Sequence, residues 1–148
     1  MLEKVCWGKT LNSGQTCIAP DFAVVQENAL DGFVEGFRKA CEKFYNPQNK
    51  GIDQSKDYGR IINNANFDRV LALLEDAKEK GANIEFGGKV EKGDKYIQPT
   101  LLTNVNKNMK VMQDEIFGPI LPVMSYKNKE DVTDLLRSFP SPLALYIM

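Results

Sequence analysis

Strand-like runs alternate with amphipathic helices along this chain, and that alternation limits the fold more than any other feature of the sequence. Strands separated by helices of ten or more residues are typical of an α/β fold, in which a mostly parallel sheet carries helices on both faces. We therefore predict that fold class for the 148 residues, as one globular unit. The predicted strands are 22–26, Asn83–Phe86, Thr100–Thr103 and Ile120–Tyr126.

Three helices are predicted because apolar residues recur every three or four positions. The first ends before Asn46 and Pro47, the second spans 66–80 with Gly81 as its C-terminal cap, and the third spans 129–139 with Asn128 as its N-cap. The side chains expected to face the core are Leu30, Phe33, Val34, Phe37, Ala40, Cys41, Phe44, Phe67, Val70, Leu71, Leu74, Ala77, Val132, Leu135, Leu136 and Phe139.

The end of the chain reads PLALYIM, residues 142–148. This apolar run predicts one more buried strand, and no turn or polar tail follows it. We therefore expect the sequence to stop inside the fold, as a domain truncated at this end would.

Charge and hydropathy exclude several classes of protein. The 19 basic and 20 acidic residues give a net charge of -1 and form no basic block, which argues against nucleic acid or an anionic membrane as partner. No apolar run is long enough for a membrane span, and the first residues lack the apolar stretch of a signal peptide. We expect a cytoplasmic protein with a small-molecule partner.

The three cysteines, Cys6, Cys17 and Cys41, match no disulfide framework and no metal-binding or redox spacing. The chain has no histidine, so a Cys-His dyad and a histidine-ligated zinc site are excluded, and we expect no metal. Cys41 lies on an apolar helical stripe and Cys6 lies beside Trp7, so both are predicted to be buried.

Cys17 differs from the other two because small and polar residues precede it, which suits a turn whose amides point at a substrate oxygen. Composition alone still favours burial of Cys17, since free cysteine is among the most buried residue types. Its nearest cation in sequence, Lys9, is expected to be a solvated surface residue. Local chemistry therefore leaves the role of Cys17 open.

Two stretches carry a resemblance to a known family. WGKTLNSGQTCIAPDF resembles the cysteine signature of aldehyde dehydrogenases, with its N-x-G-Q-x-C arrangement, and MQDEIFGP resembles the family's E-x-F-G-P element. DYGRIIN, YIQPTLL, IFGPILPV and PLALY look most like the class 3 and fatty aldehyde dehydrogenase branch. The similarity covers essentially the whole chain.

The resemblance implies a chemistry for Cys17. This residue would attack the aldehyde carbonyl to form a thiohemiacetal, hydride would pass to NAD or NADP, and water would hydrolyse the resulting thioester to the carboxylate. Glu115 would accept hydrogen bonds from the nicotinamide ribose, and Phe117 would pack near the nicotinamide, because residues two apart on an extended segment point the same way. Asn12, Gly14 and Gln15 would shape the loop. Local sequence alone favours a turn instead, with Glu115 solvated and Phe117 in the core.

The resemblance also implies that residues 1–148 are part of a catalytic domain. The family's dinucleotide-binding domain, its water-activating glutamate and its C-terminal oligomerisation segment are absent from these residues, so we expect the isolated chain to be inactive or poorly active. The complete enzyme would be a homodimer. Two alternatives stay open: a non-catalytic binding or assembly module from a truncated gene product, and a thiol redox or acyl-carrying protein that uses Cys17.

Overall fold

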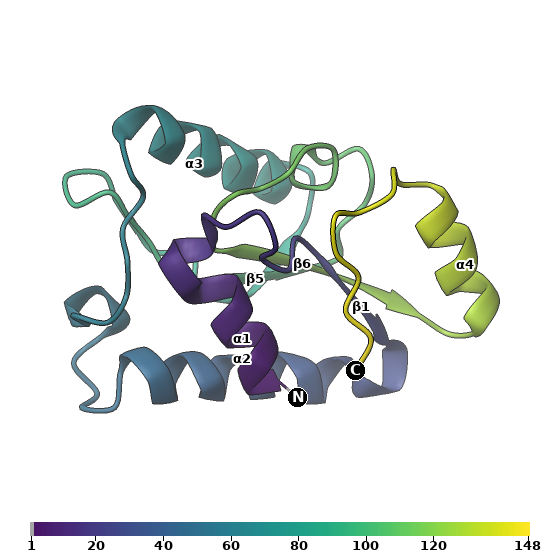
Figure 1. The fold of residues 1–148 in the computed structure, drawn as a ribbon, viewed down its shortest axis with the longest axis horizontal. Coiled ribbons are helices and arrows are strands. Elements are labelled where there is room, and N and C mark those ends of the chain that lie inside the picture. The colour runs from purple at the N-terminus through teal and green to yellow at the C-terminus, as the bar shows by residue number, and fades with distance from the viewer. Residues whose placement is uncertain (1) are drawn as a thin grey trace.

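The computed structural model describes residues 2–148 and has an α/β architecture (Figure 1). Its helices are α1 (Leu2–Thr10), α2 (Leu30–Tyr45), α3 (Asn64–Glu79) and α4 (Lys129–Arg137). Its strands are β1 (Ala23–Gln26), β2 (Asn83–Phe86), β3 (Val90–Glu91), β4 (Tyr96–Ile97), β5 (Thr100–Thr103) and β6 (Ile120–Tyr126). Short 3₁₀ turns occupy Leu11–Gly14, Glu27–Ala29, Ile52–Gln54 and Lys110–Met112.

The main sheet has the strand order β1-β6-β5-β2. β6 pairs in parallel with β1 and with β5, whereas β2 runs antiparallel to β5 at the edge. The predicted mostly parallel sheet is confirmed. β5 pairs with the first half of β6, where Thr100 aligns with Ile120, and β1 pairs with the second half, where Ala23 aligns with Val123.

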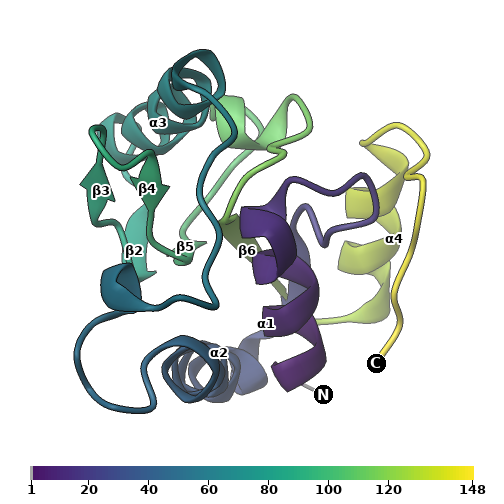
Figure 2. The same cartoon turned by 60° about the vertical axis from the view of Figure 1, so that its left-hand side comes forward.

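Helices cover both faces of the sheet, as predicted. α1 and α2 lie on one side and α3 lies on the other (Figure 1 and Figure 2). Neighbouring residues of a strand point to opposite faces. Leu101 accordingly packs in the core cluster of α1 and α2, whereas Leu102 packs in the cluster of α3.

Polar caps fix the ends of the two later helices. Asn63 accepts a hydrogen bond from Asn66 N at 2.9 Å, so α3 starts at Asn64, two residues before the predicted start. Gly81 has φ +92 and ends α3, while Ala82 N donates to Ala77 O at 2.9 Å. Asn128 caps α4 as predicted, in a capping box with Asp131.

Four parts of the chain differ from the expectations, and the first is its C-terminal segment. Residues 142–148 form no strand and are exposed, with Ile147 88% exposed, so the predicted buried strand is wrong. The segment runs between α1 and α4 in the view of Figure 1, and Tyr146 Oη donates a hydrogen bond to Ile18 O. An apolar run forms a strand only where a neighbouring strand offers hydrogen bonds.

α1 and the hairpin of β3 and β4 were not predicted. The buried residues of α1 include Lys9 and Thr10, so its inward face lacks a continuous apolar stripe. In α4, no side chain is fully buried and Leu136 is exposed, so the predicted inward face is covered only in part.

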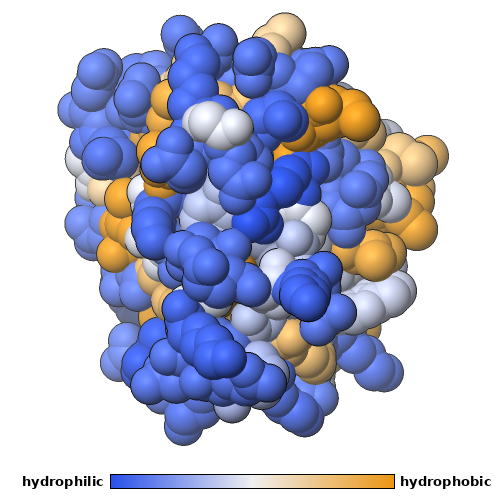
Figure 3. Space-filling view, turned by 90° about the vertical axis from the view of Figure 1, so that its left-hand side faces the viewer, coloured by the Kyte–Doolittle hydropathy of each residue, from blue (hydrophilic) through white to orange (hydrophobic). Residues whose placement is uncertain are grey.

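The face on the left of Figure 1, where segment 46–62 and the hairpin lie, is mostly hydrophilic (Figure 3). Within residues 2–148, none of the helices has the length and apolar character that crossing a membrane requires.

Candidate active site

The loop that carries Cys17 follows a left-handed turn. Asn12, Ser13 and Gly14 have φ of +51, +54 and +74 in succession. Left-handed conformation costs a residue with a Cβ about 1–2 kcal/mol, so the turn needs support from its surroundings. Cys17 lies just beyond the turn and is exposed, which makes the burial favoured by composition wrong.

Gln15 supplies much of that support. Its Nε2 donates to Asn12 O at 2.8 Å and to Arg60 O at 3.1 Å, and its Oε1 accepts from Ile62 N at 3.0 Å. Asn12 Nδ2 in turn donates to Gln15 O at 3.1 Å. These bonds tie the Cys17 loop to segment 60–62, which agrees with the loop-shaping role expected for Asn12 and Gln15.

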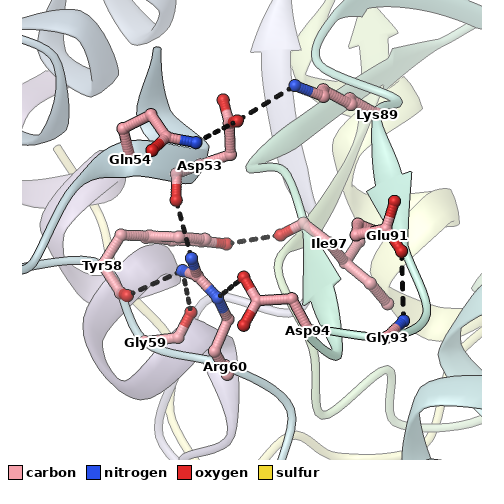
Figure 4. A network of polar contacts seen from close by, with 10 residues as sticks. All are labelled: Asp53, Gln54, Tyr58, Gly59, Arg60, Lys89, Glu91, Gly93, Asp94 and Ile97. Atoms are coloured by element: carbon pink, nitrogen blue, oxygen red, sulfur yellow. Dashed lines mark hydrogen bonds and ion pairs between the residues drawn. The ribbon is translucent and has the colours of Figure 1, made fainter. Parts of the chain in front are cut away.

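Segment 60–62 is itself held by the guanidinium of Arg60 (Figure 4). Arg60 Nη2 donates to Asp53 O at 2.7 Å, Nη1 donates to Tyr58 O at 3.0 Å, and Nε pairs with Asp94 Oδ2 at 2.8 Å. The guanidinium also stacks over the ring of Tyr96, 4.9 Å from its centroid. The planar guanidinium of arginine, with its several donors, suits this arrangement. It holds in place the segment 60–62, to which Gln15 is hydrogen-bonded.

The Cys17 loop and the E-x-F-G-P segment are in direct contact, although about a hundred residues separate them in sequence. Asp21 Oδ1 accepts a hydrogen bond from Ile116 N at 3.0 Å. On the other side of Cys17, a Cβ placed on Gly14 would lie 2.3 Å from Gly118 O. The Cys17 loop therefore touches the E-x-F-G-P segment at two points, at Gly14 before Cys17 and at Asp21 after it.

Glu115 and Phe117 are both exposed, whereas Ile116 between them is buried. Phe117 is 39% exposed, so its placement in the core, which local sequence favoured, is wrong. Its φ of +45 also interrupts the extended segment that was expected. Glu115 and Phe117 thus share an exposed turn beside the Cys17 loop.

Lys9 is 1% exposed, which overturns its expected place on the surface. Burial lowers the pKa of Lys9 to about 8, and the carboxylates of Asp21 and Glu115 oppose part of that shift. A buried cation therefore lies within the electrostatic reach of both segments of the site. The burial of Lys9 could not be predicted from Cys6 and Thr10, its neighbours on α1, because they form no continuous apolar stripe with it.

Replacing Lys9 by methionine is expected to stabilise the chain at neutral pH by roughly 3 kcal/mol, the equivalent of the lowered pKa. In the wild type the folded state binds fewer protons than the unfolded state between pH 8 and 10.5, so stability rises through that window. Lys9→Met lacks this rise. The free energy of unfolding of both proteins is measured with urea at neutral pH and at about pH 9.5, and the advantage of Lys9→Met over the wild type should be smaller at the higher pH. An advantage that stays the same at both pH values would contradict the burial of a titrating amine.

The other two thiols lie away from this loop. Cys6 and Cys41 are buried, as predicted, and their Sγ atoms are 3.2 Å apart between α1 and α2. The hydrogen bond with Cys6, together with burial, raises the pKa of the Cys41 thiol. Across residues 2–148, histidine, cysteine and carboxylate side chains form no group of three that could hold a metal ion.

Comparison with known proteins identifies the family of this chain. The sequence model of the aldehyde dehydrogenase family matches residues 1–147. The chain belongs to the aldehyde dehydrogenase family. It is 44% identical over 145 residues to rat (Rattus norvegicus) aldehyde dehydrogenase family 3 member A2, covering 98% of this chain and 28% of the relative.

Two further members of the family illustrate the extent of the match. The chain is 40% identical to the bovine (Bos taurus) dimeric NADP-preferring aldehyde dehydrogenase, covering 98% of this chain and 57% of the relative. A substrate-bound structure of Staphylococcus aureus AldH superposes with a TM-score of 0.87 at 39% identity, covering 96% of this chain and 30% of that one. This member of the family thus spans between about a quarter and three fifths of the length of these relatives.

Sequence reasoning missed two side chains that hold the two segments of the candidate site together. Asp21 contacts Ile116, and Arg69 of α3 donates to Ile116 O at 2.8 Å and to Phe117 O at 3.3 Å. Neither residue carries a local signal, since an aspartate after a proline and an arginine on a helix are ordinary surface residues.

Proposed function

We propose that this chain is the nucleophile-bearing part of an NAD- or NADP-dependent aldehyde dehydrogenase and that Cys17 is its nucleophile. The observation that carries the proposal is the contact of the Cys17 loop with the turn of Glu115 and Phe117 on both sides of Cys17. Cys17 is also the exposed thiol among three cysteines, the other two being buried. An exposed thiol on a strained, well-supported loop suits nucleophilic catalysis.

In the first step the Cys17 thiolate adds to the carbonyl carbon of the aldehyde. The new carbon–sulfur bond gives a tetrahedral thiohemiacetal, and the former carbonyl oxygen becomes an oxyanion. The backbone N–H of Cys17 would donate to that oxygen, as preorganised donors do in acyl transfer. Loss of hydride from the same carbon leaves a thioester on Cys17, and water then cleaves the thioester to the carboxylate and the free thiol.

The side chains of the Glu115 turn fit a nicotinamide cofactor. Glu115 is an exposed carboxylate, which accepts hydrogen bonds and suits ribose hydroxyls. Phe117 offers an exposed ring that suits packing near a flat nicotinamide. When bound, NAD or NADP would accept the hydride. The bovine relative is named as NADP-preferring, and we leave both cofactors in the proposal.

We further propose an aldehyde as the small-molecule substrate, and a homodimer for the complete enzyme in line with the name of the dimeric bovine relative. The 148 residues contain no glycine-rich G-x-G-x-x-G motif that would cradle a dinucleotide phosphate. A polypeptide of these residues alone is therefore expected to react at Cys17 and to turn over poorly or not at all.

The function is tested by following reduced nicotinamide after an aldehyde and NAD or NADP are added to the purified complete enzyme that contains these residues. Formation of the carboxylate in equal amount with reduced cofactor supports the proposal. Oxidation of Cys17 to a disulfide or sulfenic acid without carboxylate would favour a thiol redox protein instead. Binding of a partner with no reaction at Cys17 would favour a non-catalytic module.

A further inference from the structure

The backbone around Ile116 is held by two charged side chains from distant parts of the chain. Asp21, from the Cys17 loop, accepts from Ile116 N at 3.0 Å. Arg69, from α3, donates through Nη2 to Ile116 O at 2.8 Å and to Phe117 O at 3.3 Å. A carboxylate and a guanidinium thus bind the N–H and the C=O of one residue, which lies between Glu115 and Phe117.

These contacts act on a strained turn. Phe117 has φ +45, a conformation that a bulky residue adopts only when its surroundings impose it. The two carbonyls that Arg69 contacts flank the Cα of Phe117, so the guanidinium fixes the peptide units on both sides of the strained residue. Hydrogen bonds to charged groups contribute more than neutral ones, which suits them to this task.

Arg69 is otherwise free for this role. It is exposed, and none of the ion pairs found among residues 2–148 includes it. Arginines elsewhere on the helices behave differently: Arg38 of α2 pairs with Glu35 of its own helix. Loss of Arg69 should therefore disturb the turn while leaving the core in place.

We infer that Asp21 and Arg69 are positioning residues that clamp the turn of Glu115 and Phe117 against the Cys17 loop. The clamp couples the nucleophile segment to the cofactor segment, because Asp21 lies four residues after Cys17. The effect on cofactor binding rests on the proposed function; the effect on the turn does not. Two measurements separate these claims.

The first measurement is amide hydrogen exchange of the chain by NMR. Arg69→Met is expected to speed exchange of the Ile116 N–H by about ten-fold or more, while amides of β6 and α2 keep their rates. Asp21→Ala should do the same, and Asp21→Asn, which keeps an acceptor oxygen, should restore nearly the wild-type rate. Arg38→Met is the matched control and should change nothing at Ile116. Unchanged exchange at Ile116, or faster exchange throughout the chain, would overturn the clamp.

The second measurement is the KM for NAD when the complete enzyme that contains these residues oxidises an aldehyde. Arg69→Met is expected to raise it by about ten-fold and to leave the KM for the aldehyde unchanged. An equal rise in both KM values would overturn the assignment of the clamp to the cofactor segment. If the complete wild-type enzyme that contains these residues oxidises no aldehyde, the proposed function fails, and the exchange measurement still decides whether the clamp exists.

Discussion

In the complete enzyme that contains these residues, Cys17→Ser is expected to abolish aldehyde oxidation, lowering kcat by on the order of 10⁴-fold or more. A serine hydroxyl is a far weaker nucleophile near neutral pH than a cysteine thiol, and the chain has no histidine that could activate the hydroxyl. Stability should change little, because Cys17 is exposed. The assay is the formation of reduced nicotinamide with aldehyde in excess.

Cys41→Ser provides the control for this prediction. Cys41 is buried beside Cys6, so its replacement is expected to lower stability and to leave the active-site chemistry intact in the protein that remains folded. Retention of normal turnover by Cys17→Ser, or loss of turnover with Cys41→Ser in fully folded protein, would contradict the assignment of the nucleophile.

Gly14→Ala is expected to destabilise the chain by about 3 kcal/mol or more and to displace the Cys17 loop. The new Cβ would lie 2.3 Å from Gly118 O and 2.9 Å from Lys9 O, both backbone atoms that cannot turn aside. The φ of +74 adds the cost of a left-handed alanine. Urea unfolding followed by circular dichroism measures the loss.

Gly32→Ala is the matched control, because it makes the same chemical change in α2 where a Cβ would meet nothing within 4 Å. Alanine stabilises a helix relative to glycine by roughly 0.5–1 kcal/mol, so the two substitutions should have opposite signs. Equal effects from both would show that the close approach of Gly14 to Gly118 is not present in solution.

Local pattern was enough to predict the elements whose buried residues are apolar. α2 and β6 have that property, and their predicted positions are confirmed. α1 was missed because Lys9 and Thr10 lie on its buried side. Residues 142–148 have the composition of a strand, but a strand also needs a hydrogen-bonding neighbour, which composition does not report.

For the candidate site, the residues could be predicted from sequence, but the contacts between its two segments could not. Cys17, Glu115 and Phe117 were predicted through the resemblance to a family, since local chemistry favoured burial of Cys17 and Phe117. The contacts that join the two segments, Asp21 with Ile116 and Gly14 with Gly118, connect residues about a hundred positions apart. No periodicity or motif spacing in one sequence records such a pair.

The most direct test of the account is the rate at which iodoacetamide labels each cysteine, with and without excess aldehyde, followed by peptide mass mapping. Cys17 should be labelled in the folded protein, and aldehyde should slow that labelling because a thiohemiacetal occupies the thiol. Cys6 and Cys41 should react only after unfolding, since both are buried. Labelling of Cys17 that aldehyde does not slow, or equal labelling of all three cysteines in the folded chain, would contradict the central claim that Cys17 is the nucleophile.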